Sequence, residues 1–199
     1  MGSTIDMLII GIQGGRGSFN EEAAITYLPQ IVAEPYELRY LYTTSNVFEA
    51  LDKGEIDRGQ FAIFNNQGGL YEESLYAIAE HTFKIVDKYS IKIRHSLMIH
   101  KDARMDEITT IMTHPQVLKQ CKNSLATKYS GLRLEVGEGE LTDPAKIAEA
   151  IASQRLTRSV ATVSNRQMAQ IYGLSIVEYD LQDRMDNEST FLLVKGRLK

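Results

Sequence analysis

The sequence predicts an α/β fold with two similar lobes around a cleft. Short β-branched apolar runs alternate with segments that open on helix-capping residues, once before and once after a long extended stretch at residues 84–100. Such alternation indicates sheets with right-handed crossover helices, and a strand that long can serve two sheets. We therefore expect one module over residues 1–199, with lobe 1 at about 7–93 plus 181–199 and lobe 2 at about 94–180.

The first half of the chain carries signals for a β-α-β-α-β unit. The run at residues 8–12 ends in glycines, which is typical of a buried parallel strand. Ser18 and Glu21 have the Ser-x-x-Glu spacing of a capping box, so a helix should begin there. The first helix should end between Pro29 and Pro35. The other expected elements are strands at 36–42 and 61–64 and a second helix that opens at Asn46 with Glu49 and stops at Gly54.

The second half repeats the pattern after a helix at 72–81. Asp143 followed by Pro144 is a strong helix start, because Asp caps and Pro suits the first turn. Ser164 with Gln167 repeats the capping-box spacing, and Gly173 is a natural helix stop. The strands expected in this half lie at 107–113, 132–136, 159–163, 175–179 and 191–194, with a further helix after Pro115.

The composition excludes several classes of protein. The chain has 199 residues and a formal net charge of -4. Its single cysteine, Cys121, excludes an internal disulfide framework and a cysteine-built zinc site. No apolar run approaches the ~20 residues that span a bilayer, and the interleaved charges argue against a nucleic-acid footprint. We expect a cytoplasmic protein with no metal, no membrane contact and no nucleic-acid partner.

A glycine-rich loop at residues 11–17 is the first candidate for chemistry. Its backbone N–H groups lie beside the start of a helix, an arrangement that suits a phosphate or a carboxylate. The spacing differs from the dinucleotide G-x-G-x-x-G, so a nucleotide cofactor is disfavoured and we expect no cofactor. The alternative is a tight turn that merely needs glycine.

Three further polar loops are candidates. Asn65, Asn66 and Gln67 follow a strand and can orient a ligand through their amides, although Asn and Gly are also common in turns. His114 can donate to an anion or titrate, but a helix-cap role is the favoured alternative for a lone histidine. The loop at 186–191 carries two hydroxyls and two carboxylates, which suits proton transfer, yet loops are polar by default.

Five segments, taken in order, resemble the catalytic module of the prephenate dehydratase family. In chain order, they match its G-x-x-G-[ST]-[FY]-[SH]-x-x-A-A, P-I-E-N-S-x-x-G, H-x-L, H-P-Q-x-L-x-Q-C and N-x-T-R-F motifs at residues 14–24, 62–69, 95–97, 114–121 and 187–191, respectively. The resemblance implies catalytic roles for Ser189 and Thr190. It implies substrate binding by Gly17, Ser18, Phe19, Asn65, Asn66, Gln67, His95, Ser96, His114, Gln116, Thr142, Asn187 and Phe191.

The resemblance also implies a fold and a ligand. Members of the family are similar to type II periplasmic binding proteins and hold prephenate, a small dicarboxylate, in the cleft between two lobes. They usually continue into a C-terminal ACT domain that binds phenylalanine, whereas this chain ends at Lys199. We therefore expect no feedback regulation by phenylalanine. The family tends to dimerise, so a homodimer is an expectation here.

Four departures from the family motifs leave three functions open. Ser189 stands for the threonine tied to proton delivery, Thr190 for an arginine suited to a carboxylate, Phe64 for a glutamate and Asn66 for a serine. One hypothesis keeps the dehydratase that forms phenylpyruvate, with Ser189 as the proton donor. Its positive charge would come from Arg16, Arg94 or His114. The alternatives are a non-aromatising prephenate decarboxylase of secondary metabolism and a binding protein without catalysis.

Overall fold

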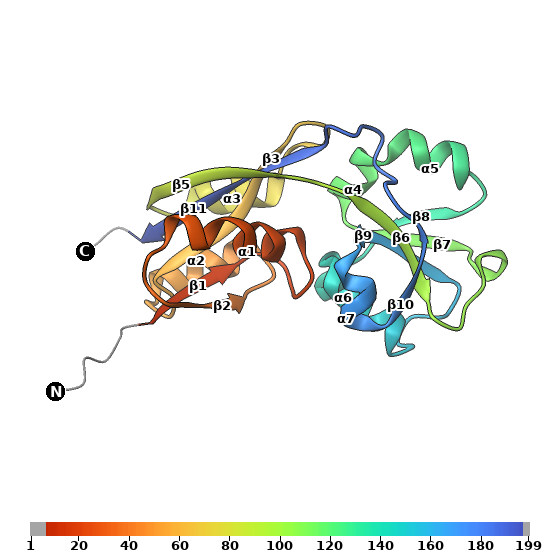
Figure 1. Cartoon of the computed structure of the whole chain (residues 1–199), viewed down its shortest axis with the longest axis horizontal. Helices are drawn as coiled ribbons and strands as arrows, with labels where there is room; N and C mark the ends of the chain where they lie inside the picture. Colours follow the sequence, from red (N-terminus) through yellow and green to blue (C-terminus); the bar gives the residue numbers. More distant parts are fainter. Residues whose placement is uncertain (1–6, 197–199) are drawn as a thin grey trace.

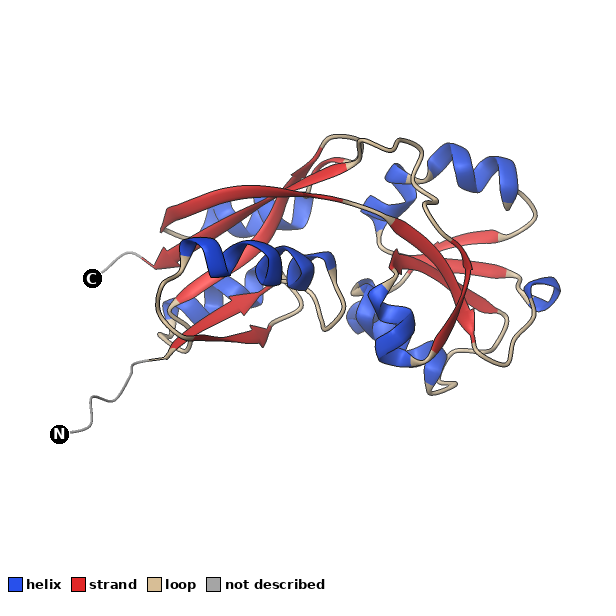
Figure 2. Cartoon of the chain, viewed as in Figure 1, coloured by secondary structure: helices blue, strands red, loops and turns tan. Residues whose placement is uncertain are grey.

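Two mixed sheets, one in each of two lobes, form the framework of the computed structural model, which describes residues 7–196 (Figure 1). Helices cover both faces of each sheet (Figure 2). This arrangement confirms the predicted α/β fold with two lobes. No helix in residues 7–196 is both long and apolar enough to cross a membrane.

The first sheet has the strand order β2-β1-β3-β11-β5, and β4 pairs with β3. The first three of these strands are parallel, while β11 runs antiparallel to both of its neighbours. The strands are β1 (Leu8–Ile12), β2 (Tyr36–Tyr40), β3 (Arg58–Asn65), β4 (Gly69–Leu70), β5 (Phe83–Lys92) and β11 (Glu188–Gly196). The helices are α1 (Phe19–Ile31), α2 (Thr44–Asp52) and α3 (Glu72–Glu80).

The second sheet has the strand order β10-β6-β9-β7-β8. Strands β7, β8 and β9 are parallel, and β6 is antiparallel to β9 and β10. The strands are β6 (His95–His100), β7 (Thr110–Thr113), β8 (Arg133–Val136), β9 (Val160–Asn165) and β10 (Leu174–Glu178). The helices are α4 (Pro115–Gln120), α5 (Lys122–Lys128), α6 (Pro144–Ala152) and α7 (Gln167–Tyr172), with short 3-10 turns η1 (Met105–Glu107) and η2 (Gly139–Thr142).

Each sheet is sandwiched between two apolar layers. In the first lobe, α1 packs on β1 through Leu28 and Ile10, while α2 packs on the opposite face through Phe48 against Phe61. In the second lobe, α4 and α5 cover one face, and α6 and α7 cover the other. Full burial of each such side chain contributes roughly 1.5–3 kcal/mol, so both lobes have substantial cores of their own.

Two crossings join the lobes (Figure 1). The predicted long extended stretch is confirmed: it forms β5 in the first sheet and continues through Ile93 and Arg94 into β6 in the second. The return crossing follows β10 and ends where β11 begins. Arg94 on the first crossing contacts Asp180 on the second at 3.4 Å. The crossings therefore lie side by side at the boundary between the lobes.

Of the two helix boundaries predicted in the first lobe, one is confirmed and one is wrong. Helix α1 ends at Ile31, between Pro29 and Pro35 as predicted, and it accommodates Pro29 because a proline in the last turn removes only one backbone hydrogen bond. Helix α2 begins at Thr44 and is capped by Thr43, whose hydroxyl accepts from the N–H of Asn46. Asn46 is therefore a residue of the first turn rather than the cap.

The predicted capping box at Ser164 is also wrong. Ser164 belongs to β9, and the neighbouring Asn165 side chain accepts the hydrogen bond from the N–H of Gln167. The helix after Pro115 is split at Cys121 into α4 and α5. Asp143, in contrast, caps α6 as predicted and accepts from the N–H groups of Ala145 and Lys146.

Candidate active site

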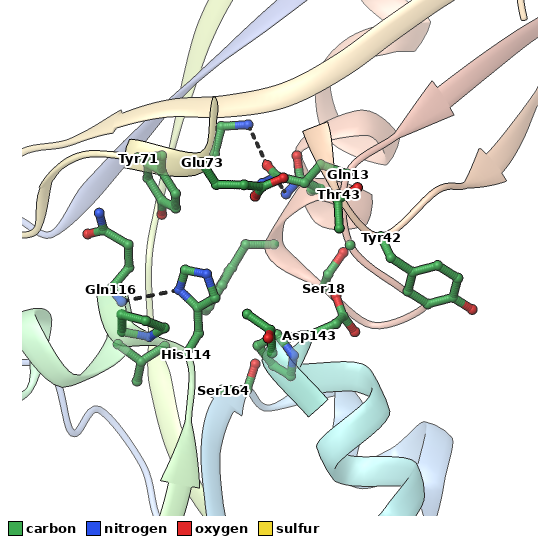
Figure 3. Close-up of a pocket in the computed structure, with 18 of the residues that line it drawn as sticks. Gln13, Ser18, Tyr42, Thr43, Tyr71, Glu73, His114, Gln116, Asp143 and Ser164 are labelled. Carbon is green, nitrogen blue, oxygen red and sulfur yellow. Dashed lines mark hydrogen bonds between the residues drawn. The ribbon is translucent and has the colours of Figure 1, made fainter. Parts of the chain in front are cut away.

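A cavity of about 750 Å³ lies between the lobes (Figure 3). Its first-lobe wall comes from the β1–α1 loop, the β2–α2 loop and the start of α3. Its second-lobe wall comes from β6, the starts of α4 and α6, and η2. Seven of the predicted site residues line it: Ser18, Phe19, His95, His114, Gln116, Thr142 and Phe191. The other eight do not: Gly17, Asn65, Asn66, Gln67, Ser96, Asn187, Ser189 and Thr190.

The glycine-rich loop reaches the cavity, but two of its backbone N–H groups already donate hydrogen bonds within the protein. Ser18 caps α1 by accepting from the N–H of Glu21, as predicted. The N–H of Gly17 donates to the Glu21 carboxylate at 2.6 Å, and the N–H of Gly15 donates to Asp143 at 3.2 Å. Because carboxylates of the chain itself take these two donors, neither is free for a ligand anion.

The Asn65 turn lies behind the cavity wall. Asn65 is fully buried and donates to the Ser189 hydroxyl at 2.9 Å. Asn66 and Gln67 instead hold the return crossing: Asn66 donates to the carbonyl of Asp186, and Gln67 to the carbonyl of Arg184. The turn therefore positions the segment before β11 rather than touching the cavity directly.

The two histidines on the second-lobe wall are neutral. His114 caps α4, as the favoured alternative predicted, because its Nδ1 accepts from the N–H of Gln116 at 3.1 Å (Figure 3). Burial, together with the charge of Lys119, lowers the pKa of His114 to about 4. Burial lowers the pKa of His95 to about 4 as well. At neutral pH neither imidazole is therefore in the charged form that acts as a general acid.

Ser189 is fully buried and does not itself line the cavity. Its hydroxyl lies 3.3 Å from the hydroxyl of Tyr71, and Tyr71 lines the cavity. Burial raises the pKa of Tyr71, so its phenol stays protonated. Ser189 can therefore reach a ligand through the hydroxyl of Tyr71, which Figure 3 shows on the side of His114 and Gln116.

Thr190 lies on the opposite face of β11. Successive side chains of a strand point to opposite faces, and Thr190 pairs with Ser90 of β5 and with Phe64 of β3. Its hydroxyl lies 3.0 Å from that of Ser90, and Phe64 is 42% exposed. An arginine at 190 and a glutamate at 64 would face each other on this outer surface. In this chain neither Thr190 nor Phe64 lines the cavity.

The cations in the cavity are not those that we expected. Arg94 binds Asp180 at the crossing, and Arg16 lines a smaller neighbouring pocket of about 260 Å³. Two lysines line the main cavity instead: Lys119, 3.6 Å from Glu72, and Lys146, 5.0 Å above the ring of Tyr42. The acidic residues on the wall are Glu72, Glu73, Glu140 and Asp143.

Sequence reasoning missed several wall residues. Gln13 donates to Glu73 at 2.8 Å (Figure 3). Glu73 also accepts from the N–H of Thr44 at the start of α2. Lys119 and Gln120 lie inside the His-Pro-Gln segment, so their position next to that motif was a usable signal. Tyr71 carried no such signal, because its neighbours are ordinary helix-start residues.

The comparisons with known proteins agree with this geometry. A family model described as "Prephenate dehydratase" matches residues 10–198. Arogenate dehydratase/prephenate dehydratase 2, chloroplastic, of Arabidopsis thaliana is 32% identical over 185 residues, which are 93% of this chain and 45% of that protein. Arogenate dehydratase 2 of Petunia hybrida is 32% identical over 187 residues, 94% of this chain and 44% of that protein.

Solved structures share the fold. A prephenate dehydratase from Arthrobacter aurescens in complex with L-Phe has a TM-score of 0.77 at 20% identity, over 96% of this chain and 61% of that one. GqqA, described as a novel type of quorum quenching acylase, has a TM-score of 0.72 at 20% identity, over 96% of this chain and 65% of that one. The chain spans a little under half the length of the plant relatives. Because the family model covers nearly all of its residues, the chain belongs to the prephenate dehydratase family.

Proposed function

We propose that the protein is a lyase that removes water and CO2 from prephenate or from its amino-acid counterpart, arogenate. One observation carries the proposal: motif residues of the family, far apart in the sequence, line one cavity from both lobes. His95, His114 and Gln116 contribute from the second lobe, and Ser18 from the first. The products would be phenylpyruvate from prephenate and phenylalanine from arogenate.

The reaction requires the enzyme to position the substrate and to supply one proton. The bond between the ring and its carboxylate breaks, its electrons form a ring double bond, and the C4 hydroxyl leaves. That hydroxyl needs a proton to depart as water. Asn65 donates to the Ser189 oxygen, so the Ser189 proton is free to point toward Tyr71 at the cavity wall. We assign proton delivery to Ser189 acting through Tyr71.

Two lysines supply positive charge for the carboxylates. Lys119 and Lys146 lie on the cavity wall, and each is also paired with a glutamate: Glu72 at 3.6 Å and Glu149 at 3.0 Å. Surface ion pairs of this kind contribute only about 0–1 kcal/mol. Either lysine can therefore turn to a substrate carboxylate at small cost.

Arogenate is the second candidate substrate because the wall is rich in acceptors. Arogenate carries an ammonium group where prephenate carries a ketone. Glu73 and Asp143 line the cavity, and so do Asn20 and Gln116, each of which has a buried side-chain oxygen without a hydrogen-bond partner in the described part of the chain. An ammonium group offers hydrogen bonds to such oxygens, and a ketone offers none.

A product assay tests the proposal. The protein is incubated separately with prephenate and arogenate, and the products are identified by NMR. Phenylpyruvate or phenylalanine supports the lyase, and the faster reaction identifies the substrate. A dihydroaromatic product that keeps its hydroxyl would indicate the decarboxylase instead, and two unchanged substrates would indicate a binding protein. The changes at Phe64 and Thr190 give no support to the decarboxylase, since neither side chain lines the cavity.

A further inference from the structure

A chain of three side-chain amides leads from Asn65 and Asn187, which do not line the cavity, to Gln120, which does, and ends at His95. Two backbone N–H groups fix the orientation of the first amide in this chain, that of Asn65. The N–H groups of Gln67 and Gly68 both donate to Oδ1 of Asn65, at 2.9 and 2.7 Å. That atom is therefore the oxygen, and the other end of the Asn65 amide is the NH2 group.

Each amide then fixes the orientation of the next one through a hydrogen bond between their side chains. The NH2 of Asn65 donates to Oδ1 of Asn187 at 2.7 Å, so the NH2 of Asn187 points the other way. It donates to Oε1 of Gln120 at 2.8 Å. The same Gln120 oxygen lies 2.8 Å from Nε2 of His95. Because an amide oxygen only accepts, Nε2 of His95 must carry the proton.

The other ring nitrogen of His95 is therefore a bare acceptor. In the neutral ring one nitrogen donates and the other accepts, and burial keeps this ring neutral by lowering its pKa to about 4. His95 is 1% exposed and lines the cavity, and its Nδ1 has no hydrogen-bond partner among the described residues. Leaving a buried acceptor unpaired costs free energy. A ligand that donates a hydrogen bond to Nδ1 of His95 would remove that cost.

We propose that Nδ1 of His95 accepts a hydrogen bond from the ring hydroxyl of the substrate and that the amide chain positions it. This inference rests on the proposed function. Prephenate with both carboxylates ionised has one hydrogen-bond donor, its C4 hydroxyl, and arogenate shares that group. Gln120 is a positioning residue, since its role here is to fix the tautomer of His95 through their hydrogen bond.

The amide chain also links binding to proton delivery. The Asn65 NH2 that orients Asn187 donates to Ser189 as well, at 2.9 Å. The substrate hydroxyl would be held through its hydrogen by His95, which leaves the lone pairs of its oxygen for the proton from Ser189 and Tyr71. The two backbone N–H groups at the Asn65 turn thus set the direction of both hydrogen bonds. The amide chain thus gives Asn65 and Asn187 a role in the site although neither lines the cavity.

The tautomer can be measured directly on the unmodified protein. Heteronuclear NMR of nitrogen-labelled histidine should show His95 neutral at pH 7, with the proton on Nε2 and a bare Nδ1. A proton on Nδ1, or an imidazolium, would overturn the inference. In the Ser189→Ala protein, where turnover is slow, prephenate should shift the Nδ1 signal, and phenylpyruvate, which lacks the ring hydroxyl, should not. Equal shifts with both compounds would also overturn it.

Two variants of Gln120 separate positioning from structure. In Gln120→Glu the carboxylate favours the imidazolium, so kcat/KM at pH 7 should fall by about tenfold or more, which corresponds to one lost hydrogen bond. Activity should recover as the pH is raised and the ring loses its extra proton. Gln120→Met removes the acceptor without adding charge, so its activity should fall without that recovery. If the two variants had the same pH profile, the assignment of Gln120 would be contradicted.

The unmodified protein separates this inference from the proposed function. If it turned over neither substrate, the proposed function would be refuted, and the tautomer of His95 could still be measured.

Discussion

Ser189 stands at the end of a hydrogen-bonded path that begins at Asn65 and reaches the cavity through Tyr71. Because the proposed role is proton transfer rather than binding, Ser189→Ala should lower kcat by about 10²–10⁴-fold and leave KM nearly unchanged. Steady-state kinetics with prephenate and arogenate measure both quantities. The matched control is Ser90→Ala, on the outer face of the same sheet, where the serine contacts Thr190. Equal losses in the two variants would argue against Ser189 as the donor.

Phe64 and Thr190 allow a second test at the level of single residues. They are cross-strand partners on the outer face of β3 and β11. Restoring the family pair in Phe64→Glu with Thr190→Arg should leave kcat and KM within about twofold, as for other surface changes. Unfolding in urea should show a gain of about 0.2–1 kcal/mol over the single Phe64→Glu variant. A large rise in activity would instead place the arginine in the catalytic machinery.

The residues that could be predicted are those whose role is local. The capping role of His114 follows from its place before Pro115, and the structure confirms it. Tyr71 and Gln120 could not be assigned in that way, because their importance comes from contacts with Ser189 and His95, which are distant in the sequence. Thr190 shows the converse: the motif suggested a place in the cavity, but strand alternation decides which way its side chain points.

At the scale of elements, local signals succeeded where one residue type dominates and failed where packing decides. Asp143 with Pro144 begins α6 as predicted. Ser164 and Gln167 have the right spacing, but Ser164 is held in β9 by pairing with Ser96. Likewise, no proline or glycine near Cys121 predicts the break between α4 and α5. Tertiary contacts override capping propensity in both cases.

Asp143 joins one element of each lobe, which permits a test at this scale. One carboxylate oxygen caps α6 by accepting from Ala145, and the other accepts from the N–H of Gly15. Asp143→Ala should lower the free energy of unfolding by about 1 kcal/mol through loss of the cap, as measured by chemical denaturation. Asp143→Asn can keep the cap but places an NH2 group against the N–H of Gly15. It should therefore raise KM with little change in stability. The interlobe contact would be unimportant if both variants bound substrate normally.

At the scale of the molecule, a net charge of -4 is compatible with a dicarboxylate ligand only if charge is distributed unevenly. The sequence suggested Arg16, Arg94 or His114 as the cation, since a basic residue in a motif loop is the visible signal. The fold instead brings Lys119 and Lys146 to the wall from the second lobe. Their role depends on how the two lobes face each other, and no local pattern encodes that arrangement. The lobe limits stated from the sequence remain a prediction.

Two neutral buried histidines make the whole molecule sensitive to acid. His95 and His114 have pKa values of about 4 in the folded protein, because burial disfavours their charged forms, against an ordinary value of 6.5. The unfolded chain therefore binds more protons than the folded chain as the pH falls from 6.5 toward 4. Stability that is complete above pH 6.5 should decline through this range, by on the order of 3 kcal/mol for each histidine.

This loss is large against the 5–15 kcal/mol that usually stabilises a domain, so urea unfolding at a series of pH values should show a steep fall in the free energy of unfolding below pH 6.5. The double variant His95→Gln with His114→Asn should flatten that fall, because neither new side chain titrates and Asn can still cap α4. The carboxylates are the same in both proteins, so the difference between the two slopes reports the histidines alone. Parallel slopes would mean that the imidazoles are not held neutral by the fold.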